Sequence, residues 1–412
     1  MAAAEFNWED PLDLESQLTD EERTNGVGSA EDHARLKLAR VARRHADVFD
    51  ALADFVADGH ALSVLHGNHD IELHWDGLKA DFRALVAARA PEAERASAAE
   101  RVEFVPWFFY REGVAYIEHG HQYDPFCSTR FVLSPVSPRD PRRVERGFSE
   151  TLLRAIVRRT PGLKEHGHED RGLGSYIGWG LGLGFAGSWG LVRRFFETVA
   201  ELVHIQRAYR TPRGVALAEE HERHLDAMAE RTGLGGDKLR RLASLHSPPI
   251  SSTLLGVLGS VMLDRLAVGL VMTIALALTL VLWRTGVIGS AGPWALGALA
   301  ALWIALHVAL SRARGSVDPA AEMTRRVKDI AELFPAPYVV MGHTHVPLVH
   351  RSADVTYINV GGWSEEAPDE KDATAKPYRA PRTHLVIHDH PEGAVAHLHA
   401  WDPTEGPKPH AG

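Results

Sequence analysis

Three stretches of the sequence place a glycine beside side chains that can bind metal ions. Each follows a short apolar run, and they are Gly67-Asn68-His69-Asp70, His119-Gly120-His121 and Gly342-His343-Thr344-His345. Asn68 offers a neutral oxygen ligand, and His69 can bind a metal or move a proton. In an extended segment His343 and His345 would point the same way, because they are two residues apart. Open α/β sheets place their chemistry at the carboxyl ends of the strands, so the ordered set predicts one metal centre.

The composition narrows the classes of protein to which the chain can belong. Its 412 residues suggest about two or three domains, and 45% hydrophobic with 24% charged residues are ordinary for a globular protein. The net charge of -9 argues against a nucleic-acid partner, because a phosphate backbone attracts a basic surface. The one cysteine, Cys127, excludes a disulfide framework and a cysteine-based zinc site, whereas 24 histidines favour imidazole ligands. Residues 1–35 are acidic and lack an apolar core, so we expect no secretory signal there.

The first metal-binding stretch follows a helix and a buried strand. Apolar residues recur at helical spacing from Leu38 to Phe55, after a capping-box pattern at Ser29–Asp32. Gly59 stands where a glycine would end this helix, and Ala61–Leu65 reads as the strand that leads into the loop. A helix, a glycine turn, a strand and a polar loop form an α/β unit.

Further helices and strands are predicted around the other two stretches. A helix is expected over Asp76–Ala90, and Asp318-Pro319 is expected to start another whose stripe runs from Met323 to Phe334. The hairpin strands are Val102–Tyr110 and Val114–Glu118, and later strands are Tyr338–Met341, Val355–Val360, Thr383–His388 and Ala394–Ala400. We expect a tail after about Pro403.

Residues 130–250 depart from this α/β alternation. A basic run extends from Arg139 to Arg159, and it would either attract anionic lipid headgroups or form a solvated helical face. The uncharged, glycine-rich stretch Gly172–Val192 would make a poor regular helix and suggests an apolar hairpin or an interfacial segment. Phe195–Tyr209 has the pattern of an amphipathic helix.

Two apolar runs predict a transmembrane hairpin. Leu266–Trp283 and roughly Ala291–Leu310 are each near the length of about 20 residues that a bilayer requires. The alternative is a helical pair buried in a large core. Three arginines flank the outer ends of the pair, Arg265 before it and Arg312 and Arg314 after it, whereas the joint holds only Arg284. Because positively charged residues favour the cytoplasmic side, this difference predicts that the large polar parts lie in the cytoplasm.

With these motifs, the chain resembles the calcineurin-like metallophosphoesterases. The stretch at 67–70 matches that family's GNH[D/E] block, His119 its lone downstream histidine, and the stretch at 342–345 its GHxH block. Asn359-Val360-Gly361-Gly362-Trp363 resembles an N-x-G-x-W stretch that often follows. The resemblance covers about residues 34–124 and 318–401. It suggests a phosphoesterase domain in two parts, 1–129 and 316–403, with a helical insertion at 130–250, the transmembrane hairpin within 251–315 and a tail at 404–412.

The resemblance implies a four-layered α/β/β/α sandwich that holds two divalent metal ions, of the kind Mn, Fe or Zn. A carboxylate and a water or hydroxide would bridge the two ions. Asn68, His119 and His343 would hold one metal, and His345 would help to hold the other. His69 would contact the phosphate, oriented by Asp70, and His121 would contact the substrate.

Two earlier blocks of that family, D-x-H and G-D-x-x-D, are missing from the sequence. Asp58-Gly59-His60 spells D-x-H, but it lies in a helix-to-strand turn and follows no apolar strand. One explanation is that the natural protein carries roughly 30–60 residues before Met1, enough for both blocks and their crossover. The other is a degenerate domain that lacks a bridging carboxylate and has unpaired sheet edges. The intact later motifs favour the first explanation.

These inferences lead to two functional hypotheses. The first is a metal-dependent phosphoester hydrolase anchored in the cell (inner) membrane with a cytoplasmic catalytic domain. Its partners would be membrane lipids and a phosphorylated small-molecule, nucleotide-linked or lipid substrate, with phosphoproteins a further option. The second is a catalytically impaired membrane scaffold or regulator built on a degenerate phosphoesterase domain.

Overall fold

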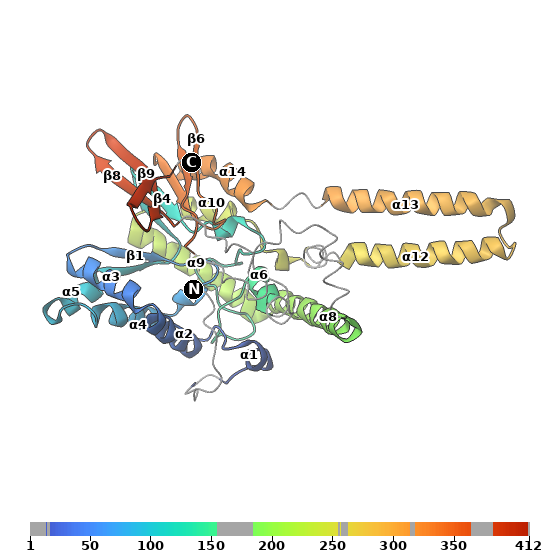
Figure 1. The fold of residues 1–412 in the computed structure, drawn as a ribbon, viewed down its shortest axis with the longest axis horizontal. Helices are drawn as coiled ribbons and strands as arrows, with labels where there is room; N and C mark the ends of the chain where they lie inside the picture. The colour runs from blue at the N-terminus through green and yellow to red at the C-terminus, as the bar shows by residue number, and fades with distance from the viewer. Residues whose placement is uncertain are drawn as a thin grey trace.

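The computed structural model describes residues 17–154, 184–253, 263–313, 318–363 and 382–410, together with residues 14 and 256. Within them the chain is a mixed α/β protein with three sheets (Figure 1). The largest sheet has five strands, in the order β3 (Phe108–Arg111), β4 (Ala115–Glu118), β5 (Tyr338–Met341), β7 (Thr356–Asn359) and β6 (Leu348–Arg351). Its three central strands β4, β5 and β7 are parallel, whereas β3 and β6 are antiparallel to their neighbours.

Two smaller sheets flank this arrangement in the sequence. Strands β1 (Leu62–Leu65) and β2 (Val102–Val105) form a parallel pair, and β8 (Thr383–His390), β9 (Gly393–Asp402) and β10 (Gly406–Pro409) form an antiparallel sheet. The expected tail after Pro403 is therefore wrong, because β10 pairs with β9. The expected strand Val102–Tyr110 is divided into β2 and β3 around Pro106, which lacks the N–H that a continuous ladder needs.

The N-terminal helices surround the β1–β2 pair. They are α1 (Asp20–Asn25), α2 (Glu31–Arg44), α3 (Ala46–Ala57), α4 (Asp76–Ala87) and α5 (Arg95–Glu100). The single helix expected up to Phe55 is divided at His45, whose backbone angles are not helical. The capping box lies at Thr19 and Glu22 instead of Ser29–Asp32, because the Ser29 hydroxyl donates to the Val144 carbonyl. Gly59 follows the end of α3 with a φ of 97°, as a terminating glycine should.

The region at 130–250 shares a core with the large sheet. Its helices are α6 (Phe148–Leu152), α8 (Gly184–Ala208), α9 (Pro212–Thr232) and α10 (Gly236–Ser244). Leu225 of α9 and Leu239 of α10 belong to the same buried cluster as Met323 and Ile330 of α14 (Pro319–Leu333). Each such side chain stabilises the fold by about 1.5–3 kcal/mol, so this region contributes to the same core as the sheet.

The outcome for the glycine-rich stretch is mixed. Residues 172–183 lie outside the described part of the chain, but from Gly184 onward the stretch is helical within α8. The expectation of a poor helix is therefore wrong for that half, whereas the amphipathic helix expected at Phe195–Tyr209 is confirmed as the end of α8. The short 3-10 turns are Ile71–His74, Glu92–Glu94, His121–Tyr123, Ile250–Ser252 and Gly289–Ala291.

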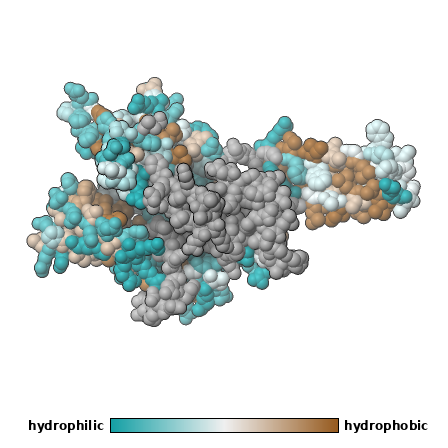
Figure 2. Space-filling view, viewed as in Figure 1, coloured by the Kyte–Doolittle hydropathy of each residue, from teal (hydrophilic) through white to brown (hydrophobic). Residues whose placement is uncertain are grey.

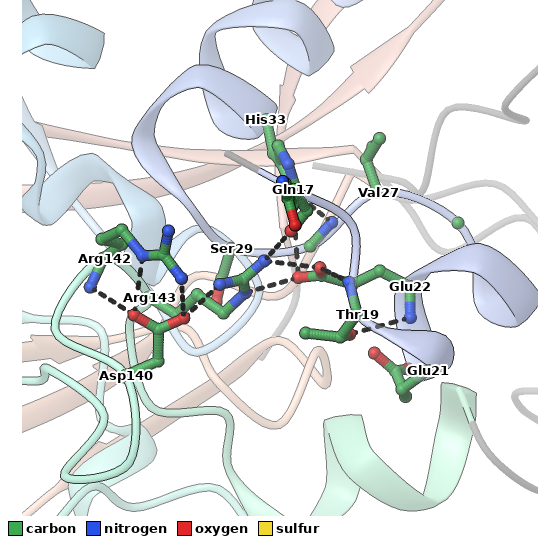
Figure 3. Close-up of polar contacts among 12 residues, drawn as sticks. Gln17, Thr19, Glu21, Glu22, Val27, Ser29, His33, Asp140, Arg142 and Arg143 are labelled. Carbon is green, nitrogen blue, oxygen red and sulfur yellow. Dashed lines mark hydrogen bonds and ion pairs between the residues drawn. The ribbon is translucent and has the colours of Figure 1, made fainter. Parts of the chain in front are cut away.

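Several arginines of the basic run bind carboxylates inside the protein. Figure 3 shows Arg143 between α1 and the loop before α6, where it donates to Glu22 at 2.8 and 2.6 Å and also contacts Asp140. Arg146 and Arg154 each pair with Glu21. Residues 139–146 form no helix, so the solvated helical face expected there is wrong; Arg158 and Arg159 lie outside the described residues.

A helical hairpin projects away from the folded domain. Helices α12 (Leu263–Arg284) and α13 (Gly292–Ala313) lie antiparallel to each other (Figure 1). Figure 2 shows that their surface is largely hydrophobic. Among the described residues one helical stretch, Gly289–Leu310, is long and apolar enough to cross a membrane, and none of it is buried. The neighbouring apolar stretch Val268–Arg284 is shorter. The expected alternative of a pair buried in a core is therefore wrong.

Candidate metal centre

Parallel pairing brings the second and third of the candidate metal-binding stretches to one edge of the large sheet. His119 follows β4 and Gly342-His343 follows β5, at the carboxyl ends of adjacent parallel strands. The backbone N–H groups of Gly342 and His343 both donate to the His119 carbonyl, at 3.1 and 3.0 Å. The rings of His119 and His343 lie with their centroids 5.3 Å apart. The structure thus brings these two predicted ligands together.

The first stretch reaches the same place from β1. Gly67 packs directly against the His119 ring, since a Cβ atom added at Gly67 would lie 2.4 Å from His119 Nε2. This close approach requires glycine and brings the loop that carries Asn68 next to His119. The backbone N–H of Gly67 donates to Asp70 Oδ1 at 2.6 Å, which closes the loop.

The resemblance implies that Asp70 orients His69, but this expectation is wrong because the Asp70 carboxylate accepts from the Gly67 N–H instead. The carboxylate beside His69 belongs to Glu150 of α6, whose Oε2 lies 3.5 Å from His69 Nδ1. The His69 side chain is 45% exposed. It faces solvent at the entrance of the loop, with one ring nitrogen directed at a carboxylate from the region at 130–250.

The third stretch is a turn and not an extended segment. The His345 N–H donates to the Gly342 carbonyl at 3.1 Å, and His345 has a φ of 59°. The expectation that His343 and His345 point the same way as neighbours on an extended strand is therefore wrong. The His345 ring instead packs on Gly362, where an added Cβ would lie 3.1 Å from it.

Asn359 holds this turn in place. Its Nδ2 donates to the Thr344 hydroxyl at 2.8 Å, and its Oδ1 accepts from the Gly361 N–H at 2.9 Å. Trp363 Nε1 donates to the Thr383 carbonyl at 2.6 Å, which ties the stretch to the start of β8. The N-x-G-x-W stretch therefore supports the turn, and its asparagine is 2% exposed.

Burial keeps the central imidazoles neutral. Burial, reinforced by the neighbouring His343, lowers the pKa of His119 well below its ordinary value. Burial and the neighbouring His119 do the same to the pKa of His121. Neutral imidazoles retain the lone pair that a metal ion needs. Among the described residues, Asn68 Oδ1, His119 Nδ1 and His121 Nδ1 are buried atoms without a hydrogen-bond partner. Such atoms are costly unless they meet a ligand.

His121 is poorly placed for the substrate contact expected of it. The residue is 4% exposed, and its Nε2 lies 2.9 Å from Gln122 Nε2. Its ring lies 5.1 Å from that of His119, measured between centroids. The structure therefore buries His121 within the protein, next to His119.

Asp124 is a member of the site to which the sequence reasoning gave no role. Its Oδ2 lies 3.0 Å from His343 Nε2. Burial alone would raise the pKa of Asp124, but hydrogen bonds from His343 and from the Phe126 N–H hold it below its ordinary value. Asp124 lies five positions after the predicted ligand His119 in the sequence. A carboxylate so close to a predicted ligand is the pattern from which its role could have been predicted.

One preformed group of possible ligands stands out in the described part of the chain. It consists of Asp124, Cys127 and His343, whose ligand atoms all lie within 4.8 Å of one another. Burial raises the pKa of the Cys127 thiol, and its Sγ lies 3.1 Å from the Ser149 hydroxyl oxygen. A protonated thiol is a weak ligand, so the aspartate and the histidine are the stronger members.

Comparison of the chain with family models, with curated proteins and with solved structures found no match.

Proposed function

We propose that this protein is a membrane-anchored, metal-dependent phosphoester hydrolase of the calcineurin-like metallophosphoesterase type, with the four-layered sandwich of that family. The observation that carries the proposal is the meeting of three distant stretches at one sheet edge. There Asn68 Oδ1 and His119 Nδ1 are buried without a partner among the described residues. Carboxyl ends of parallel strands are the usual position for such a site.

The residues at this edge fit a divalent metal ion. Asn68, His119 and His343 would hold one ion through oxygen and nitrogen atoms, a donor set that suits Mn, Fe or Zn. His345 would help to hold a second. Asp124 would orient His343 through its hydrogen bond, as carboxylates do for many metal-binding histidines. When bound, the metal would polarise a phosphoryl oxygen and lower the pKa of the attacking water.

His69 and Glu150 would handle the leaving group. Burial alone would raise the pKa of Glu150, but His69 and the positive charge of Arg146 lower it, so the carboxylate is ionised. An ionised carboxylate beside Nδ1 favours a proton on that nitrogen and leaves Nε2 to face the substrate. In the imidazolium form, which carries a second proton on Nε2, His69 would donate a hydrogen bond or that proton to the departing oxygen.

The hairpin would place this site at a bilayer. The exposed apolar surface of α12 and α13 supports an anchor that enters the inner membrane and returns, with the catalytic domain in the cytoplasm. A site beside the membrane favours a lipid phosphate or a nucleotide-linked lipid as substrate, with a soluble phosphoester as the alternative. Arg265 and Arg312 flank the ends of the hairpin nearest the domain.

The test is hydrolysis of an aryl phosphodiester by the full chain in detergent with Mn²⁺. We expect activity that His343→Ala abolishes and that His350→Ala, an exposed position on β6, leaves unchanged. Equal rates for the wild type and His343→Ala would refute catalysis at this site. An inactive wild type without bound metal would support a scaffold or regulator instead.

A further inference from the structure

A second concentration of histidines lies on the β8–β9 hairpin, outside the site described above. Strand residues alternate between two faces, so positions two apart share a face. On one face of this hairpin the pairing gathers five histidines, which we call the histidine ladder: His384, His388, His390, His397 and His399. His384 stands directly opposite His399, and Val386 stands opposite His397.

The rings of the ladder follow one another at short distances. The centroids of His384 and His399 lie 5.4 Å apart, and those of His399 and His397 lie 6.2 Å apart. The series continues from His397 to His388 at 6.4 Å and from His388 to His390 at 5.9 Å. Two imidazoles on one tetrahedral ion have centroids about 5 Å apart, given metal–nitrogen distances near 2.0–2.1 Å. Modest side-chain rotation would therefore bring neighbouring rings onto one ion.

A merely solvated face does not require this composition. The opposite face of the hairpin packs inward through residues such as Leu398, which is 7% exposed. The outward face needs only polar side chains, and lysine, threonine or glutamate would serve. The ladder instead holds imidazoles, and its intervening positions are Val386 and Val395.

One ring nitrogen of the ladder also lacks a partner. Nδ1 of His399 is buried and has no hydrogen-bond partner among the residues that the structure describes. Strand β9 is also hydrogen-bonded to the large sheet, because the Tyr338 hydroxyl of β5 donates to the Ala394 carbonyl and accepts from the Ala396 N–H. The rings therefore project from a strand that is held against the large sheet.

We propose that the histidine ladder is a second metal site, which binds a borderline divalent transition metal such as Zn²⁺, Ni²⁺ or Cu²⁺. Imidazole nitrogen suits these ions, and the paired positions of β8 and β9 on this face include no carboxylate that would favour Mg²⁺ or Ca²⁺. The central ligands would be His384, His397 and His399, which adjoin one another on paired strands. This proposal does not depend on hydrolysis at the metal centre.

The test is equilibrium dialysis of the metal-stripped full chain in detergent against Ni²⁺. We expect His397→Gln combined with His399→Gln to bind about one equivalent less than the wild type. His60→Gln combined with His350→Gln removes two exposed histidines elsewhere, and we expect it to bind as the wild type does. Because His399 is partly buried, His384→Gln combined with His388→Gln provides an independent ladder variant.

Binding of Cu²⁺ provides a second measurement, because its spectrum reports how many nitrogen atoms coordinate the ion. Electron paramagnetic resonance of added Cu²⁺ should show coupling to at least two nitrogen atoms, and the amount of Cu²⁺ with this coupling should fall by about one equivalent in both ladder variants. Equal Ni²⁺ binding by the wild type and both ladder variants would overturn the proposal. Loss of binding in the His60 and His350 control alone would also overturn it.

Discussion

The metal centre and the histidine ladder use the same side chain in opposite surroundings. At the candidate metal centre His121 is buried and the side chain of His343 is 9% exposed, and the two residues follow the adjacent parallel strands β4 and β5. On the ladder, His388 and His397 are exposed and stand on a single hairpin. A buried ring has its direction and its protonation decided by neighbours, whereas an exposed ring can turn toward whatever ion arrives. The contrast fits the proposed catalytic role for the first group and the proposed binding role for the second.

The strongest test of this contrast is the removal of one buried ring. His119→Ala takes away the ligand that touches both other stretches, and we expect phosphodiester hydrolysis with Mn²⁺ to fall by at least about 100-fold. His397→Gln on the ladder should leave the rate unchanged. A rate in His119→Ala close to that of the wild type would remove the distinction between the two groups.

A second test displaces the same ring without deleting it. Gly67→Ala adds a Cβ atom 2.4 Å from His119 Nε2, so the ring or the loop must shift. We expect activity to fall by about 10- to 100-fold, since a shift of about 1 Å at a reacting group has effects of that size. Gly235→Ala is the matched control, because its added Cβ meets nothing within 4 Å. Equal activity in the two variants would contradict the close packing.

A third test uses pH to report burial. Burial holds the pKa of His121 well below 6.5 in the folded protein, so the unfolded chain takes up a proton that the folded chain refuses. Stability is therefore lost as the pH falls below 6.5. Between pH 7 and pH 5 the wild type should lose more unfolding free energy than His121→Gln does. Urea unfolding followed by tryptophan fluorescence measures this, and parallel pH profiles would contradict it.

The smallest expected effect concerns the support of the third stretch. Asn359→Ala removes the donor to the Thr344 hydroxyl and the acceptor of the Gly361 N–H. We expect it to destabilise the protein by about 1–2 kcal/mol in thermal unfolding and to lower activity. His388→Gln on the ladder should change stability by less than about 0.5 kcal/mol. A larger effect at His388 than at Asn359 would reverse the comparison.

Local patterns in the sequence predicted the strands and the stretches that follow them. Apolar runs ending at Leu65, Glu118 and Met341 marked three strands, because burial of a short strand is visible as composition. The predicted meeting of His119 and His343 followed from the general placement of sites in parallel sheets. The four-layered arrangement remains a prediction.

Partners distant in the sequence were not predictable in this way. Glu150 contacts His69, and Asp124 contacts His343. Both contacts depend on the path of the loops, which the hydrophobic periodicity of the sequence does not predict. The same holds for Arg143, which pairs with Glu22 across 121 positions of the sequence. Asp70 was assigned to the nearest histidine, but its carboxylate met a closer backbone N–H. Hydrogen-bond competition of this kind is decided in three dimensions.

The position of the helical hairpin within the chain has a consequence for biosynthesis. Strand β4 ends before the hairpin and strand β5 begins after it, and the Asp124–His343 contact spans 219 positions. Closing so long a loop is entropically unfavourable, so contacts of this separation form late in folding. They also require strand β5 to have been synthesised. During synthesis both helices of the hairpin are complete before Tyr338 is added to the chain. Under the proposed function, we therefore expect the proposed anchor to be inserted before the proposed catalytic centre is completed.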